Sequence, residues 1–151
     1  MILDERTEFC DATSLNTGGA GSYLIGDVID SGSVVRDLGR GGRPIYFVVT
    51  VSTSVTSAGS ATVQFHLASD AQAAIATDGT ASYHLSSGAI AKATLVAGYN
   101  VIAAAVPMAG TAYERYLGVL QTTAVAALTA GAVDAFLTLS VPKHQVYNNA
   151  I

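Results

Sequence analysis

Hydrophobic and polar residues alternate along much of the chain, which is the pattern of strands that bury one face. In Ala61–Leu67 the apolar residues occupy the odd positions, and Thr62, Gln64 and His66 stand between them. Tyr46–Val55 has the same period and is rich in β-branched and aromatic residues, which favour strands. Similar runs are found at Tyr23–Ile29, Ala81–Leu85, Leu95–Ala105, Arg115–Thr123 and Val133–Val141. The pattern predicts about eight short strands and an all-β fold.

Glycine, serine and aspartate mark the turns between these runs, at Ser57–Ser60, Thr77–Thr80, Ser86–Gly88, Ala97–Gly98 and Thr129–Gly131. Short strands separated by such turns are typical of an antiparallel sandwich or barrel. Two stretches stay open. Ala68–Thr77 also fits a helical turn capped by Ser69 or Asp70, and Val101–Val106 is too rich in alanine for periodicity to separate strand from helix.

The chain reads as a single domain, 1–151, with distinct ends. Residues 1–12 hold five charges with Leu3 and Phe9 among them, which predicts a short N-terminal arm. Residues 13–22, with three glycines, are expected to form a flexible link. The sandwich is predicted over 23–141, and 142–151 is expected to be a C-terminal tail.

The composition is poor in charge for a domain that stands alone. Charged residues make up 12%, hydrophobic residues 50%, and the mean hydropathy is +0.44. Charge normally keeps an isolated domain soluble, so we infer that other protein chains cover much of the surface. The net charge of −4 opposes binding to nucleic acid.

No membrane segment or secretory signal is predicted. The most apolar late window, Thr122–Val141, carries Asp134, and the start of the chain lacks a basic flank followed by an apolar run. A lone Cys10 forms no internal disulfide, and its acidic neighbours Glu8 and Asp11 disfavour a reactive thiolate.

Residues of the kinds that carry chemistry do not form a recognisable catalytic, metal or cofactor site. His66, His84 and His144 have no metal-binding spacing, although His66 and His84 are able to meet across paired strands. No serine lies in a nucleophile-elbow motif. Gly39–Pro44 lacks the ending of a phosphate loop, so it is read as a basic hairpin that reaches a partner or as a solvated turn.

Two further groups of residues have plain interpretations. Arg115 is expected to close a local ion pair with Asp37 or Glu114. The seven tyrosines are interpreted mainly as half-buried sheet residues, some of them at subunit contacts, in preference to an aromatic strip for sugars or bases.

Several segments resemble a family of capsid cement, or decoration, proteins of short-tailed bacteriophages. They are Val34–Val49 (VVRDLGRGGRPIYFVV), Ala61–Asp70 (ATVQFHLASD), Leu95–Asn100 (LVAGYN), Glu114–Gln121 (ERYLGVLQ) and Gly131–Leu139 (GAVDAFLTL). Met1–Asp4 followed by Phe9 also matches the usual start of such chains. The likeness extends over nearly the whole chain in the same order.

The resemblance implies a jelly-roll β-sandwich that sits on the outside of a capsid and clamps neighbouring major capsid protein subunits against the pressure of packed DNA. The expected partners are the major capsid protein and a second copy of the chain, as a homodimer in preference to a homotrimer, with no nucleic acid and no membrane. The expected interface residues are Leu3, Phe9, Arg36, Arg40, Arg43, Tyr113 and Arg115. We expect no enzymatic activity and no cofactor.

Other classes of function are weighed beside this one. A carbohydrate- or receptor-binding sandwich module of a virion surface or tail structure is the main alternative. An enzyme is the third class, and stoichiometric zinc or iron in the purified protein would favour it.

Overall fold

The structure is a computed structural model that describes residues 4–32, 38 and 43–141. Within these residues the strands are β1 (Glu8–Ser14), β2 (Gly21–Asp30), β3 (Tyr46–Ser57), β4 (Thr62–Asp70), β5 (Ser82–Ser86), β6 (Ile90–Ala91), β7 (Asn100–Ala105), β8 (Tyr116–Ala124) and β9 (Leu128–Thr138). Two single-turn 3₁₀ helices, η1 (Glu5–Thr7) and η2 (Lys92–Thr94), complete the elements. The prediction of an all-β chain is confirmed.

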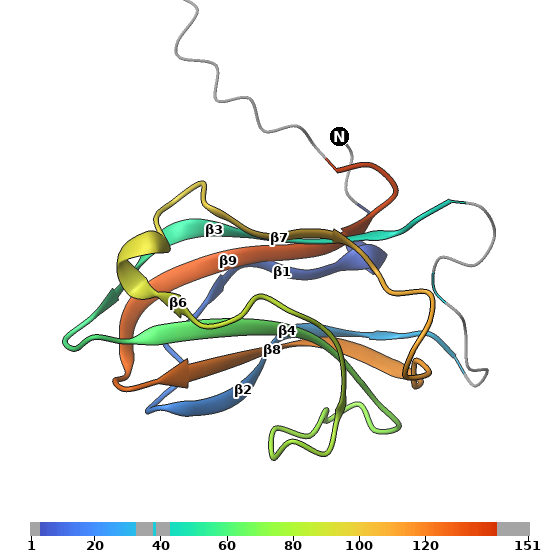
Figure 1. The fold of residues 1–151 in the computed structure, drawn as a ribbon, viewed down its shortest axis with the longest axis horizontal. Coiled ribbons are helices and arrows are strands. Elements are labelled where there is room, and N and C mark those ends of the chain that lie inside the picture. The colour runs from blue at the N-terminus through green and yellow to red at the C-terminus, as the bar shows by residue number, and fades with distance from the viewer. Residues whose placement is uncertain (1–3, 33–37, 39–42, 142–151) are drawn as a thin grey trace, which may run out of the picture.

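The strands form two antiparallel sheets packed face to face (Figure 1). One sheet has the order β1-β9-β3-β7, and the other has the order β2-β8-β4-β5, with β6 also paired to β4. The chain crosses between the sheets at every connection except those that join β4, β5 and β6. This order is that of an eight-stranded jelly roll, so the predicted jelly-roll-like sandwich of about eight strands is confirmed.

The core lies between the two sheets and follows the alternation seen in the sequence. Phe47, Val49 and Val51 of β3 are fully buried, as are the odd-numbered apolar residues of β4. The ring of Phe9 meets that of Phe47 edge to face, with centroids 5.9 Å apart. Such interdigitated packing fixes one register, because a slip of one residue would turn each buried face outward.

The predicted N-terminal arm is wrong for residues 8–12. They belong to β1, which pairs with β9, and only 1% of Phe9 is exposed. β1 also lies against β2 at Gly26, where an added Cβ would come within 2.0 Å of the Phe9 carbonyl oxygen. The sandwich therefore begins at Glu8, and removal of the first eleven residues would take part of the core with it.

The segment predicted as a flexible link is largely built into the fold. Thr13 and Ser14 end β1, and β2 begins at Gly21. Between them Leu15 is fully buried, its carbonyl accepts a 3.0 Å hydrogen bond from Gln121 Nε2, and its N–H donates to the Gly131 carbonyl. The predicted tail, 142–151, lies outside the described residues.

The structure settles one stretch that the sequence left open and corrects one predicted turn. Ala68–Asp70 continue β4, and the rest of Ala68–Thr77 forms bends and open loop, not a helical turn. Both carboxylate oxygens of Asp70 accept backbone N–H groups of this loop, and Ile75 packs over Gly118. Thr129–Gly131 is part of β9 and not a turn, since the connection from β8 occupies 125–127.

Candidate functional site

The two ends of the jelly roll differ in charge. The connections 15–20, 58–61, 87–89, 92–99 and 125–127 make one end, here called the neutral end, where Lys92 is the sole charged residue. Lys92 Nζ donates a hydrogen bond to the Ser57 carbonyl. The described parts of 4–7, 31–45, 71–81, 106–115 and 139–141 make the opposite, charged end, on the right in Figure 1. On it or on adjoining strand ends lie Asp4, Glu5, Arg6, Glu8, Asp30, Arg43, Asp70, Asp78, Glu114 and Arg115.

A groove of about 610 Å³ opens at the charged end. Its apolar wall consists of Ile29, Leu38, Ile45, Leu137 and Leu139, and Asp4 and Arg6 are among its polar residues. Leu139 is 63% exposed, which is unusual for a side chain of this size. An apolar floor with a charged rim is the usual composition of a protein–protein contact.

A smaller hollow of about 350 Å³ lies beside the groove and is acidic. Glu5, Glu8, Asp27 and Asp30 line it, and Arg6 belongs to both concavities. Burial raises the pKa of Glu8, and the nearby carboxylates of Asp11, Asp134 and Glu5 raise it further. The hollow therefore favours a positively charged or hydrogen-bond-donating group from a partner.

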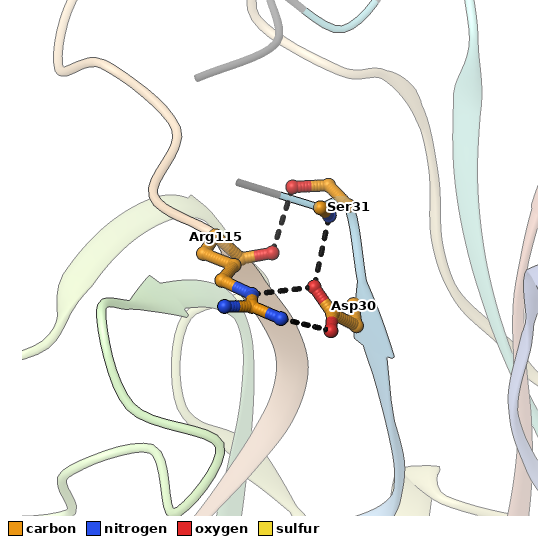
Figure 2. Close-up of polar contacts among 4 residues, drawn as sticks. Asp30, Ser31 and Arg115 are labelled. Carbon is orange, nitrogen blue, oxygen red and sulfur yellow. Dashed lines mark hydrogen bonds and ion pairs between the residues drawn. The ribbon is translucent and has the colours of Figure 1, made fainter. Parts of the chain in front are cut away.

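Asp30 and Arg115 form a bidentate ion pair at the charged end (Figure 2). Arg115 Nε and Nη2 donate to the two carboxylate oxygens of Asp30 at 2.9 and 2.8 Å. The N–H and hydroxyl of Ser31 both donate to the Arg115 carbonyl, and the Gly32 N–H donates to Asp30. These bonds fasten the end of β2 to the start of β8.

The pair also shifts the ionisation of both groups. The hydrogen bonds from Arg115 and then from the Gly32 N–H lower the pKa of Asp30 to about 2. The pKa of Arg115 is raised by Asp30, and its guanidinium carbon lies 4.9 Å from the centre of the Tyr116 ring. Both side chains are 46% exposed, so the pair orders the surface more than it stabilises the fold.

Arg115 pairs with Asp30 and not with the predicted Glu114. Glu114 instead accepts a 2.9 Å hydrogen bond from the Ser82 hydroxyl, and Asp37 lies outside the described residues. Asp30 is about 85 positions away in sequence, and the pairing of β2 with β8 brings it opposite Tyr116. A partner so distant is visible only once the sheet order is known.

Of the seven predicted interface residues, two are exposed at the charged end, two are buried, and three lie outside the described residues. Arg43 is exposed, and Arg115 lies at the same end. Leu3, Arg36 and Arg40 lie outside the described residues. Phe9 is unsuitable because it packs in the core, and Tyr113 is unsuitable because it is only 5% exposed.

Tyr113 has a structural role instead. Its hydroxyl donates to the Pro107 carbonyl at 2.7 Å, and its ring stacks on His84 with centroids 3.9 Å apart. Burial raises its pKa to about 12. The ring holds the 106–115 connection against β5.

The apolar residues of the groove were not singled out from the sequence. The strand predicted at Val133–Val141 placed Leu139 within a sheet, whereas β9 ends at Thr138 and leaves Leu139 in the open. Ile29 and Ile45 stand at a strand end and just before a strand, where alternation no longer tells a core residue from a surface one.

The two described histidines do not share a site. His66 Nδ1 lies 2.6 Å from the Ser86 hydroxyl on one face of β4, whereas His84 Nε2 lies 2.7 Å from the hydroxyl of Ser69, which points to the opposite face. Burial lowers the pKa of both rings. The described residues hold no group of three or more side chains suited to bind a metal ion.

Cysteine and tyrosine chemistry is also limited in the described part of the chain. Cys10 is buried in the core, and burial raises the pKa of its thiol to about 12. Among the described tyrosines only Tyr83 counts as exposed, so they form no aromatic strip there. Nor do these residues include a helix of the length and apolar character needed to cross a membrane.

A known protein family matches most of the chain. No curated protein matches the chain. Residues 16–137, about four fifths of the sequence, match the family described as Bbp16, which is phage-related. The match begins just after β1 and ends one residue before the end of β9, so it includes all of the jelly roll except β1 and that last residue. The chain belongs to the Bbp16 family.

Proposed function

We propose that this protein is a structural virion component that binds the outer surface of a phage capsid. In this role the charged end contacts the major capsid protein, and each copy staples neighbouring subunits against the pressure of packed DNA. Membership of a phage-related family supports a virion role. The jelly roll supplies a rigid body whose loops are free to make contacts.

The single observation that carries the proposal is the charged end with its apolar groove. The groove of about 610 Å³ has an apolar wall of isoleucine and leucine, which is unfavourable in water, so a partner that fills the groove lowers the free energy. Charges around the rim fix orientation and oppose wrong partners. The neutral end has no comparable set of charges, because Lys92 is the one charged residue in its connections.

Stapling by many weak contacts fits the low charge of the remaining surface. A standard interface buries ~1,600 Å² in total, and a protein that straddles two subunits makes two smaller ones. Release then requires both contacts to break together, which multiplies the lifetime of the bound state.

Leu139→Asp tests this proposal directly, because Leu139 lines the groove and is 63% exposed. The fold should tolerate the change, whereas a carboxylate on the apolar wall should weaken binding to shells of the major capsid protein by tenfold or more. Co-sedimentation with shells measures it. Val125→Asp, at an exposed position of the neutral end, is the matched control and should bind like the wild type.

Equal binding by the wild type and Leu139→Asp would remove the groove from the interface. Loss of binding by Val125→Asp alone would assign the contact to the neutral end. A protein that ignores shells but binds a defined glycan would instead establish the carbohydrate-binding alternative.

A further inference from the structure

The two lateral edges of the sandwich differ in how they are protected. On one side β1 and β2 lie together and carry four carboxylates, from Glu8, Asp11, Asp27 and Asp30. On the other side the edge of the β1-β9-β3-β7 sheet is β7, Asn100–Ala105, which has no charged residue. Exposed strand edges usually carry charge, proline or cover, because an open edge pairs with other strands.

The free backbone groups of β7 follow from its pairing with β3. The Val106 N–H donates to the Ile45 carbonyl at 2.7 Å, and Phe47 lies opposite Ala104. Backbone groups alternate in direction along an antiparallel strand, so those of Ala103 and Ala105 point away from β3. Both residues are exposed, and within the described chain these four N–H and C=O groups have no hydrogen-bond partner.

The usable edge is short and carries only small side chains. A register irregularity between Val49 and Thr50 disturbs the pairing at Asn100 and Val101, and Pro107 follows the strand. Between them only alanine side chains lie at the edge positions, so another backbone is able to approach closely. β5, the edge of the other sheet on this side, is less regular because its register shifts between Leu67 and Ala68 of β4.

We propose that β7 pairs antiparallel with β7 of a second copy, across a two-fold axis at Ala104. In this register Ala103 lies opposite Ala105 of the second copy, and all four free groups on each copy are hydrogen-bonded. The β1-β9-β3-β7 sheet then continues from one copy into the other. A two-fold axis closes the assembly at two copies.

A second copy fits this edge better than a strand of unlike chemistry for reasons of charge and symmetry. Antiparallel self-pairing places each free donor opposite a free acceptor, and an uncharged strand meets no like charge. Pairing through β1 and β2 would instead bring two sets of four carboxylates together. One short strand buries less than the ~1,600 Å² of a standard interface, so the dimer is expected to be weak in dilute solution.

Ala103→Pro and Ala103→Val separate the edge hydrogen bond from other effects. Proline removes an N–H that does not serve the pairing with β3, whereas valine keeps it and suits a strand. Sedimentation equilibrium of the full chain, from micromolar to millimolar concentration, should show a monomer–dimer equilibrium for the wild type and Ala103→Val. Ala103→Pro should weaken it tenfold or more. An unchanged dimer in Ala103→Pro, or a wild type that stays monomeric, would overturn the pairing.

A cross-link tests the register even where the proline variant folds poorly. Ala104→Cys should form a disulfide-linked dimer under mild oxidation, because the two Cα atoms across the axis would be about 4.5 Å apart. Ala130→Cys, at an exposed residue of the inner strand β9, should stay monomeric as the control. Cross-linking of both or of neither would contradict the register. The pairing is independent of the capsid role, since a monomer that still binds shells would refute only the dimer.

Discussion

At the scale of single residues, Val125 is the clearest departure from ordinary backbone geometry. Its φ is +75°, and the Ala126 N–H donates to the Ala124 carbonyl at 3.0 Å, which makes a γ-turn of the strained, positive-φ kind. A β-branched residue rarely adopts this conformation. Because Val125 is 75% exposed, burial of its side chain does not offset the strain.

Val125→Gly should therefore raise the free energy of unfolding by up to about 1 kcal/mol, since glycine adopts positive φ without a steric penalty. Urea unfolding measures the change. Val96→Gly, at another exposed valine with ordinary φ, should lower it by roughly 0.5–1 kcal/mol through the entropy of the unfolded chain. Similar losses in both variants would show that the γ-turn is not strained.

The buried His66 and the half-buried His84 predict a loss of stability in mild acid. Their pKa values in the folded protein lie below the ordinary 6.5, because burial disfavours the charged ring, although Glu114 partly opposes this at His84. The unfolded chain thus takes up protons first. Stability is complete above about pH 6.5 and falls as the pH drops through the folded pKa values.

Urea unfolding at about pH 7 and about pH 5 checks this, and His84→Gln should flatten the dependence. The carboxylates of Asp30, Asp70 and Asp78 do not interfere, since their pKa values lie below the ordinary 3.8 and their contribution is lost only in stronger acid. A free energy of unfolding that stays constant between the two pH values would contradict the account.

At the scale of elements, alternation was sufficient for most of the longer strands and failed for β1, in which charged residues flank two core residues. β3, β4, β5 and β8 lie where the period of two predicts them. The sequence predicts an arm in place of β1, because Glu8 and Asp11 flank the two core residues Phe9 and Cys10 and leave too short an apolar pattern. Its place in the sheet depends on β9, more than a hundred residues later.

Two other boundaries predicted from the sequence are also wrong. The sequence predicts a turn at Thr129–Gly131, yet Gly131 lies inside β9. Its φ is +138°, and an added Cβ would come within 2.9 Å of Val55 Cγ2. Close approach to another strand, and not a reversal of the chain, explains the residue. The strand predicted at Leu95–Ala105 is likewise too long, because 95–99 form a loop with a turn at Ala97 and Gly98, and β7 begins only at Asn100.

The joint between β1 and β2 gives a direct test at this scale. Gly26→Ala should lower the free energy of unfolding by more than about 2 kcal/mol, because its Cβ would clash with the Phe9 carbonyl and Cys10 Sγ. Gly79→Ala has a positive φ as well, but open space around it, and should cost about 1 kcal/mol. Thermal or urea unfolding compares the two. Equal losses would mean that β1 and β2 are not in close contact.

At the scale of the whole molecule, the division into a charged end and a neutral end organises the account. The sequence predicted an interface near Arg36–Arg43 and Arg115, and the fold brings Arg43 and Arg115 to the charged end. It did not predict the groove, because the groove is assembled from η1, the end of β2, the approach to β3 and the end of β9. The residues of the groove come from separate segments and meet only in the folded chain.

Electron cryomicroscopy of the producing phage tests the central claim most directly, because it shows how each copy sits on the shell. We predict protruding density that fits the jelly roll with the charged end, and the groove beside Leu139, against the major capsid protein. Density with the neutral end against the shell would contradict the assigned interface. Particles that carry no such protein on the outer surface would contradict the capsid role itself.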